Sequence, residues 1–145
     1  MIAVDTNILV YAHRLDSPWN QRAFECVQEL VAGTKPWLLP WPCLHEFLGV
    51  VTHPRVYRPP TTIDDAVKQV EFWLESPSVV LGAESHLYWP TLRPLLKASN
   101  LSGALIHDAR IAAICLEHGA DVLWSADRDF SRFPSLQTEN PLVSH

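Results

Sequence analysis

The sequence predicts an α/β fold built on a parallel sheet, and two observations support this prediction. Short β-prone runs alternate with longer helical segments, and right-handed crossovers between parallel strands are the natural connection for such elements. The chain has 145 residues, of which 48% are hydrophobic and 19% charged, as in globular proteins with a sizeable core. We therefore expect residues 1–145 to form a single domain.

Composition and charge exclude several classes of protein. No apolar run approaches the roughly 20 residues of a membrane span, and the first residues, MIAVDTNILV, lack the basic start of a signal peptide. The three cysteines have no paired spacing and indicate buried thiols in a reducing compartment, so we expect a cytoplasmic protein. The net charge of −5 argues against coating nucleic acid by bulk charge. It does not exclude a nuclease, because bound cations reverse the local sign of clustered carboxylates.

The N-terminal part of the chain predicts two strands, each followed by a helix. Ile2–Val4 is a short β-prone run that ends at Asp5, and the helical segment Ile8–Ala12 follows after a turn. Ser17 and Pro18 have the residue types of an N-cap and a first helical position. The next elements are a helix over Trp19–Ala32, a strand over Trp37–Leu39 and a helix over Cys43–Thr52. Asp5 is thus predicted at the carboxyl end of a strand, where open α/β sheets bind ligands.

The segment His53–Thr62, HPRVYRPPTT, is predicted to be a loop because of its three prolines. It carries Arg55, Tyr57 and Arg58, the densest basic and aromatic cluster in the chain. That mixture suits phosphate contact and base stacking. An ordinary surface loop could carry it as well, and the sequence leaves both interpretations open.

The C-terminal part continues the alternation of helices and strands. Thr62 has the residue type of an N-cap, and Pro94 is expected to kink or interrupt the helix that contains it. The predicted elements are a helix from Thr62 to about Leu74, a strand over Val79–Leu81, a helix over Ser85–Lys97, a turn over Asn100–Gly103, a helix over Ala104–His118 and a strand over Asp121–Trp124. The tail Phe133–His145 is expected to be irregular, with a last edge strand.

The helix Ala104–His118 places a carboxylate on its apolar face. An advance of about 100° per residue puts Asp108 between Ala112 and Cys115. A carboxylate at that position is costly unless something satisfies it. Asp108 either caps a neighbouring helix or pairs with an arginine, or it meets other carboxylates around a cation. The helix alone favours neither interpretation.

Other carboxylates can meet Asp108 at one edge of the sheet. Asp5 and Asp127 both follow strands closely, so they would share that edge. Glu46 could join them, although its position, roughly 150° from the apolar stripe of its helix, is typical of a solvated charge. Asn7 could cap the helix after the first strand or orient Asp5, and capping is the default. Crowded acids repel or take up protons, and Mg²⁺ or Mn²⁺ with oxygen ligands removes that conflict.

Four segments together resemble a known family. They are IAVDTNILVYA at the start, LHEF around Glu46, HDARIAAICLEHGADVLWSADRDFSRFP near the end, and the closing NPL. This ordered set resembles the PIN-domain ribonucleases and, more narrowly, the VapC toxins of bacterial toxin–antitoxin pairs. The family pattern implies a PIN-like three-layer fold, with a short central parallel sheet flanked by helices. About residues 53–100 carry no family signature.

The resemblance also implies roles for individual residues. Asp5, Glu46, Asp108 and Asp127 match the acidic quartet that holds metal and performs catalysis, and Asp129 is a further candidate ligand. It is the resemblance that assigns Glu46 to this set. Asn7 and Ser125, the latter where the family often has Thr, would support the ligands without binding metal themselves. From the composition of the loop His53–Thr62, we assign a role in substrate binding to Arg55, Tyr57 and Arg58.

The function implied by the resemblance is hydrolysis of RNA phosphodiester bonds by a Mg²⁺-dependent endoribonuclease, in which Mn²⁺ can substitute. The implied partners are RNA, a small VapB-like antitoxin covering the apolar, Trp-bearing surface, and a second copy of the chain in a homodimer. No membrane partner is expected. The alternative is a non-catalytic module whose acidic pocket binds a basic partner peptide.

Overall fold

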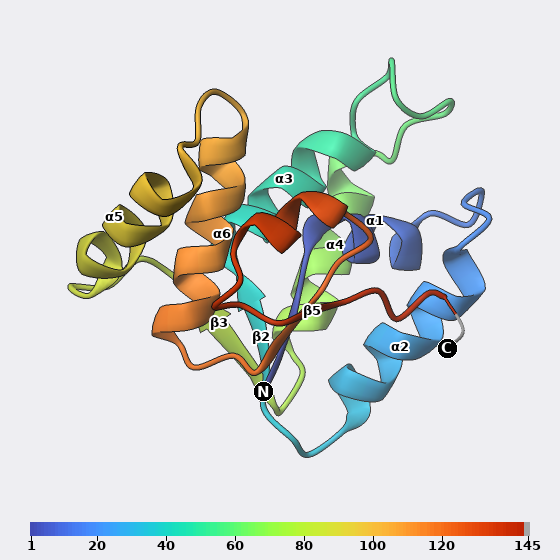
Figure 1. Ribbon diagram of the computed structural model, residues 1–145. Coiled ribbons are helices and arrows are strands. Elements are labelled where there is room, and N and C mark those ends of the chain that lie inside the picture. The colour runs from blue at the N-terminus through green and yellow to red at the C-terminus, as the bar shows by residue number, and fades with distance from the viewer. Residues whose placement is uncertain (144–145) are drawn as a thin grey trace.

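The strands of the chain assemble into one parallel sheet with helices on both sides (Figure 1). The computed structural model describes residues 1–143. Within that range, five strands lie in the order β3-β2-β1-β4-β5. They are β1 (Ile2–Val4), β2 (Trp37–Pro40), β3 (Val79–Gly82), β4 (Val122–Trp124) and β5 (Thr138–Glu139). The predicted α/β fold with a parallel sheet is confirmed.

The helices connect these strands and cover the sheet. They are α1 (Thr6–His13), α2 (Asn20–Ala32), α3 (Trp41–Val51), α4 (Ile63–Leu74), α5 (Tyr88–Ser99), α6 (Leu105–Glu117) and the short 3₁₀ helix η1 (Arg128–Arg132). In Figure 1, α5 and α6 lie to the left of the sheet and α2 to its right, where α2 packs against α1. The sheet therefore forms the middle layer between two layers of helices.

The sheet is apolar because helices cover it. Ala3, Val4, Leu38, Leu39 and Leu123 are fully buried in β1, β2 and β4, as expected for parallel strands without a solvent-facing side. The central strand β1 pairs with β2 on one side and with β4 on the other. The segments that follow β1, β2 and β4 therefore emerge at the same edge of the sheet.

The start of α1 differs from the prediction. The helix begins at Thr6, directly after β1, and its N-cap is Asp5, whose side chain accepts a hydrogen bond from Thr6 N. Aspartate is among the best N-cap residues, since its carboxylate satisfies a free amide of the first turn. The default prediction that Asn7 caps this helix is therefore wrong, because Asn7 already lies in the first turn.

In two other helices, α2 and α5, a serine explains why the helix begins later than predicted. Ser17 Oγ accepts a hydrogen bond from Trp19 N at 3.1 Å, and Ser85 Oγ accepts one from Leu87 N at 3.1 Å. In both places the serine closes a turn ahead of the helix, as serine hydroxyls commonly do. Consequently α2 begins at Asn20 and α5 at Tyr88.

The proline inside α5 does not interrupt it, so of the two predicted effects, a kink or an interruption, the interruption does not occur. The helix runs without a break from Tyr88 to Ser99 and ends where Asn100 adopts a left-handed conformation with φ of 48°. Pro94 removes one amide donor from the helix. The packing of α5 against α6, with Leu92 and Leu95 buried, offsets that loss.

Other predictions are confirmed. Thr62 caps α4 by accepting a hydrogen bond from Asp65 N, and the three cysteines are free and buried. The tail contains β5 as an edge strand, while its last two residues, 144 and 145, lie outside the described range. The 3₁₀ helix η1 was not predicted. Within residues 1–143, no helix combines the length and apolarity that a membrane crossing requires.

Candidate active site at the carboxyl edge of the sheet

The structure brings four of the predicted acids together around one cavity of about 240 Å³. Asp5 follows β1, Glu46 lies on α3, Asp108 on α6, and Asp127 between β4 and η1. The other residues that line the cavity are Thr6, Asn7, Val10, Tyr11, Val50, Tyr57 and Ile111. Carboxylates that are far apart in the sequence thus share one small space.

Asp5 is the most deeply held of these carboxylates, with 5% of its surface exposed. One oxygen, Oδ1, accepts hydrogen bonds from Thr6 N at 2.8 Å and from Cys43 Sγ at 3.6 Å. The other, Oδ2, accepts from Ser125 Oγ at 2.7 Å. Burial raises the pKa of Asp5 to about 6, and the hydrogen bonds from Ser125 and Thr6 only partly offset it.

Asn7 and Ser125 join the ends of β1 and β4. Asn7 Nδ2 donates to Asp5 Oδ2 and to Ser125 Oγ, both at 3.3 Å. Asn7 Oδ1 accepts from Ala126 N at 3.1 Å, and Ser125 Oγ accepts from Asp127 N at 2.9 Å. Both side chains therefore orient Asp5 and fix the backbone that carries Asp127.

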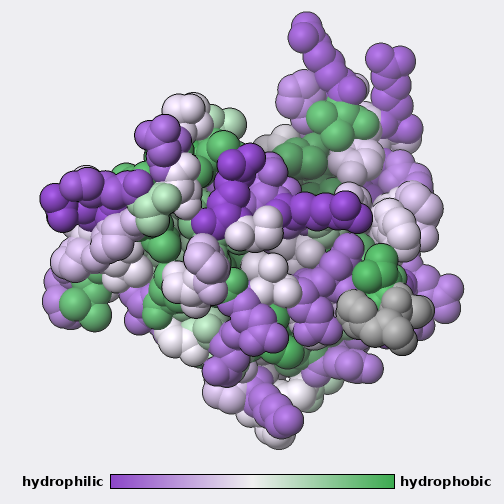
Figure 2. All heavy atoms as spheres, in the orientation of Figure 1, coloured by the Kyte–Doolittle hydropathy of each residue, from purple (hydrophilic) through white to green (hydrophobic). Residues whose placement is uncertain are grey.

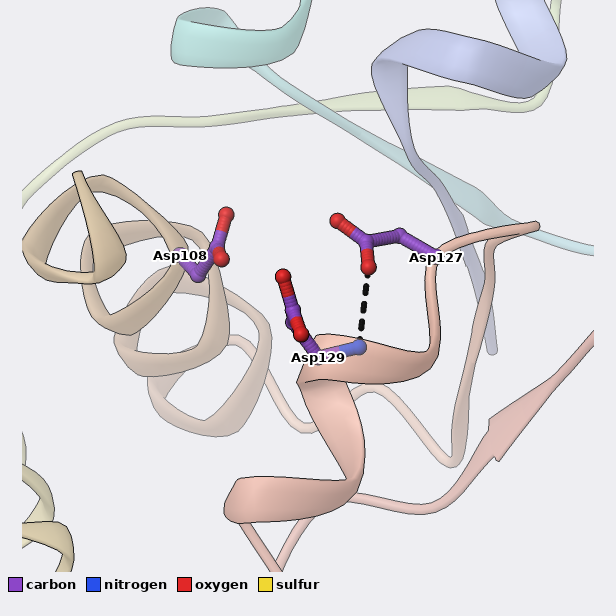
Figure 3. Close-up of side chains that lie close together, drawn as sticks. All are labelled: Asp108, Asp127 and Asp129. Atoms are coloured by element: carbon purple, nitrogen blue, oxygen red, sulfur yellow. Dashed lines mark hydrogen bonds between the residues drawn. The ribbon is translucent and has the colours of Figure 1, made fainter.

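Asp108, Asp127 and Asp129 form a closer group on the other side of the cavity. One carboxylate oxygen of each lies within 4.8 Å of the others. Figure 3 shows Asp108 projecting from α6 toward the two aspartates at the start of η1. Asp129 N donates to Asp127 Oδ1 at 2.8 Å, which holds this turn. Asp129 is not among the residues that line the cavity, so it extends the acidic group outward.

The charges of this group act on Asp108. Burial, and after it the charges of Asp127, Asp5 and Asp129, together raise the pKa of Asp108 to about 6. Within residues 1–143, Asp108 therefore neither caps a neighbouring helix nor pairs with an arginine, but faces other carboxylates. Of the two interpretations left open by the sequence, the second describes its surroundings.

Glu46 is exposed, as the helical wheel predicts, and also lies near the other acids, as the family resemblance implies. It is exposed, as its position off the apolar stripe of α3 predicts. It nevertheless lines the cavity, because this side of α3 borders the carboxyl edge of the sheet. Its charge contributes to the raised pKa of both Asp5 and Asp108.

The donor set of the cavity fits a hard divalent cation. Among the described residues that line it, none is a lysine, arginine or histidine, so the carboxylates have no cationic partner there. Thr6 Oγ1 is buried at the cavity wall and has no hydrogen-bond partner within residues 1–143. Carboxylate oxygens with a free hydroxyl nearby are suited to an ion that keeps several of its waters.

Of the three residues predicted to bind substrate, one lies at the cavity and two do not. Tyr57 lines the cavity, whereas Arg55 and Arg58 are exposed and do not line it. The loop between α3 and α4 projects beyond the body of the molecule at the upper right, with hydrophilic side chains at its tip (Figure 2). Sequence reasoning missed Tyr11, which lies one helical turn beyond Asn7 and is recognisable only once α1 is placed beside the acids.

Comparison with known proteins places this fold and site in a family. Residues 2–136 match the PIN domain. The VapC ribonuclease Mb2897 of Mycobacterium bovis is 37% identical over 142 residues, which cover 98% of this chain and 96% of the relative. Ribonuclease VapC48 of Mycobacterium tuberculosis is 32% identical over 137 residues, which cover 94% of each chain.

A solved structure agrees with this placement. VapBC-1 from nontypeable Haemophilus influenzae superposes with a TM-score of 0.65 at 20% identity, covering 97% of this chain and 98% of that chain. This likeness shows the fold. The two sequence relatives are named ribonucleases, so they give no support to a non-catalytic acidic pocket. The chain belongs to the PIN domain family and, within it, to the VapC ribonucleases.

Proposed function

We propose that this ribonuclease hydrolyses RNA phosphodiester bonds at the carboxylate cavity with Mg²⁺, and that Mn²⁺ can replace it. Asp5, Asp108 and Asp127 are the proposed ligands, Glu46 completes the set directly or through water, and Asp129 is a further candidate. One observation carries the proposal: acids from four separate segments line one cavity, and none of its lining residues in the described part of the chain is cationic. In this proposal, residues 1–145 form a single domain.

The chain contributes to this reaction mainly by holding its oxygens in place. Divalent cations, when bound, lower the pKa of a water and stabilise a leaving oxygen. Ser125 and Asn7 fix Asp5, and Asp129 N fixes Asp127, so these carboxylates need no rearrangement when the substrate arrives. Asp108, on which four other carboxylates act, is the ligand that gains most from a cation.

The test is cleavage of total cellular RNA by the purified chain with Mg²⁺, with EDTA, and with EDTA followed by excess Mn²⁺. Discrete fragments that vanish with EDTA and return with Mn²⁺ are the expected result. Cleavage that persists in EDTA would overturn the metal assignment. Absence of cleavage under all three conditions, from protein shown to be free of a bound partner, would overturn the assigned activity.

We also propose that a VapB-like antitoxin binds this chain in the cytoplasm, and that the chain forms a homodimer. The structure of VapBC-1 is that of a toxin with its antitoxin, which supports such a partner here. Exposed aromatic side chains, among them Trp19, Trp41 and Trp89, offer it apolar surface. Co-purification with the product of an adjacent gene tests the partner, and sedimentation equilibrium of the isolated chain tests the dimer.

A further inference from the structure

Besides the acids, the cavity is lined by apolar and aromatic side chains, four of which we call its aromatic end. They are Val10, Tyr11, Val50 and Tyr57. Tyr11 lies four residues beyond Asn7 on α1, and Val50 lies four residues beyond Glu46 on α3. Both walls therefore change from polar to apolar over one helical turn, about 6 Å along each helix. The acids and the two tyrosines are thus adjacent parts of the same space.

Tyr57 is held in position before any substrate binds. The guanidinium carbon of Arg14 lies 4.2 Å from the centre of the Tyr57 ring, over one of its faces. Since Arg14 occupies that face, the opposite face or the edge of the ring lines the cavity. An aromatic side chain fixed in this way loses little freedom when a ligand packs against it.

Arg14 is itself fixed by neighbouring polar groups. Its Nε donates to Asp16 Oδ1 at 2.9 Å and its Nη2 to Asp16 Oδ2 at 2.7 Å. Its Nη1 donates to Thr61 Oγ1 at 3.2 Å, at the end of the loop that carries Tyr57. The positive charge is therefore already paired with Asp16, and the role of Arg14 is to position the ring rather than to bind a phosphate.

We propose that this aromatic end binds a nucleobase of the RNA, next to the phosphate that is cleaved at the acids. The proposal rests on the proposed function. A base is planar and uncharged, which suits tyrosine rings and valine side chains in a space without an unpaired cation. The phenol hydroxyls of Tyr11 and Tyr57 can donate to or accept from the polar edge of the base. The distance of one helical turn matches the reach from a phosphate across its ribose to the base.

Two hydrolysis-resistant probes test the subsite. One is a fluorescein-labelled phosphorothioate octamer of uridine, and the other is the same backbone with abasic riboses. Wild-type protein with Mg²⁺ should bind the uridine probe about 5- to 160-fold more tightly than the abasic probe, the range for one stacked base. Tyr57→Leu should remove most of that ratio without changing the affinity for the abasic probe, and Tyr57→Phe, which keeps the ring and loses only the hydroxyl, should retain most of it.

The chain offers a matched control, because it has three tyrosines. Tyr88, at the start of α5, does not line the cavity. Tyr88→Leu should leave the ratio between the two probes unchanged, whereas Tyr11→Leu should lower it. Because Tyr11 lies on α1 and Tyr57 on a loop, agreement between their variants also excludes a local folding defect as the cause.

The outcomes separate this proposal from the proposed function. Base-dependent binding that needs Tyr57, in a protein that cleaves no RNA, would support the subsite and overturn the nuclease assignment. Metal-dependent cleavage with equal affinity for both probes would overturn the subsite alone. A Tyr57→Leu variant that binds both probes normally and loses affinity only for the antitoxin would make the aromatic end a protein contact, which also overturns the proposal.

Discussion

Asp5 and Asp108 face the same cavity, but the chain holds them differently. Both oxygens of Asp5 accept hydrogen bonds, from the backbone of α1 and from Ser125. Asp108 has acidic neighbours instead, and its raised pKa reflects burial and their charges. The free energy of folding therefore depends on Asp5 more than on Asp108, while the proposed metal site needs both.

The first prediction follows for Asp108→Asn. We expect metal-dependent RNA cleavage to fall on the order of 100-fold or more, because one preorganised charge is lost from the site. The thermal midpoint in EDTA at pH 7 should stay the same or rise, since the substitution relieves repulsion from Asp127 and Asp129. Gel assays of cleavage and thermal unfolding measure the two effects.

Asp64→Asn is the matched control, because Asp64 is an exposed carboxylate in the first turn of α4, away from the cavity. It should retain full activity. An Asp108→Asn protein that cleaves RNA as fast as this control would contradict the assignment of Asp108 as a ligand.

At the residue scale, the sequence could predict those acids whose place depends on strands. Asp5 and Asp127 follow β-prone runs, and the edge they share follows from parallel pairing. Glu46 needed the family resemblance, because a helical wheel shows which face is apolar but not what the other face borders. Tyr11 gave no signal, since a tyrosine on an amphipathic helix is ordinary until its neighbours across the cavity are known.

At the scale of elements, α6 approaches the sheet closely at Gly82, the last residue of β3. A Cβ added at Gly82 would lie 2.9 Å from Ile114 Cγ2 on α6 and 3.0 Å from Leu38 Cδ1 on β2. Ile114 and Leu38 are fully buried and have little room to move. The absence of a side chain at Gly82 therefore sets how tightly α6 covers the sheet.

The second prediction is that Gly82→Ala lowers the free energy of unfolding by about 1–3 kcal/mol, the cost of overpacking a core. Gly49→Ala is the control, because a Cβ at Gly49 meets nothing within 4 Å. Gly49 lies inside α3, so alanine there should stabilise by about 1 kcal/mol. Urea unfolding measures both, and a Gly82→Ala protein as stable as wild type would contradict the close approach.

The loop between α3 and α4 gives the third prediction. In Arg55→Ala/Arg58→Ala, affinity for the uridine octamer should fall, because both exposed arginines are expected to contact phosphates. The slope of log affinity against log salt should decrease by about 0.7 per lost contact. Fluorescence titrations at several salt concentrations provide the slope.

A double variant with the same change in net charge is the control for this loop. Lys35→Ala/Lys68→Ala removes two exposed cations outside the loop and the cavity. It should leave the salt slope close to that of wild type. If the salt slope is the same for wild type and both double variants, Arg55 and Arg58 do not contact phosphates and are ordinary surface residues.

Element boundaries were harder to predict than the elements themselves. The alternation of strands and helices gave every strand of the sheet, including the edge strand in the tail. The starts of α2 and α5 were placed too early, because a serine before a helix can cap it or close a turn ahead of it, and both use the same hydroxyl. Pro94 does not interrupt α5, because packing against α6 offsets one lost hydrogen bond.

At the scale of the whole molecule, the crowded acids link stability to pH and to cations. Asp5 and Asp108 have folded-state pKa values of about 6, above the ordinary value of 3.8. In the folded protein they hold their protons to higher pH than in the unfolded chain. Their contribution to stability is therefore present below about pH 4 and is lost as the pH rises through 6.

The fourth prediction concerns the thermal midpoint in Mg²⁺ compared with that in EDTA. Above pH 6 both carboxylates are charged and can bind the cation, so Mg²⁺ at about 100 times its Kd should raise the midpoint by about 5–10 °C. At pH 5 protons compete with the cation, and the difference should shrink. Scanning calorimetry from pH 5 to pH 7.5 measures it.

Asp108→Asn serves as the comparison in this experiment, since one of the two titrating ligands is then absent. Its midpoint should depend less on Mg²⁺ at every pH. Identical midpoints of wild-type protein with and without Mg²⁺ at pH 7 would contradict cation binding at the acids. If the increase in midpoint caused by Mg²⁺ became larger toward low pH, this would contradict competition between protons and the cation at Asp5 and Asp108.

Asp5 is both the N-cap of α1 and a proposed metal ligand, and this combination has a genetic consequence. Replacing it by alanine removes the cap of α1, at a cost of about 1 kcal/mol, and takes a hydrogen-bond acceptor from Ser125. A cell that escapes the nuclease by mutation therefore obtains different products from different codons. On the proposed function, changes at Asp5 are expected to yield a less stable chain that proteases degrade, and changes at Asp108 an abundant inactive chain that still binds the proposed antitoxin. Surviving cells with a change at Asp108 would therefore contain an inactive chain that continues to bind the proposed antitoxin.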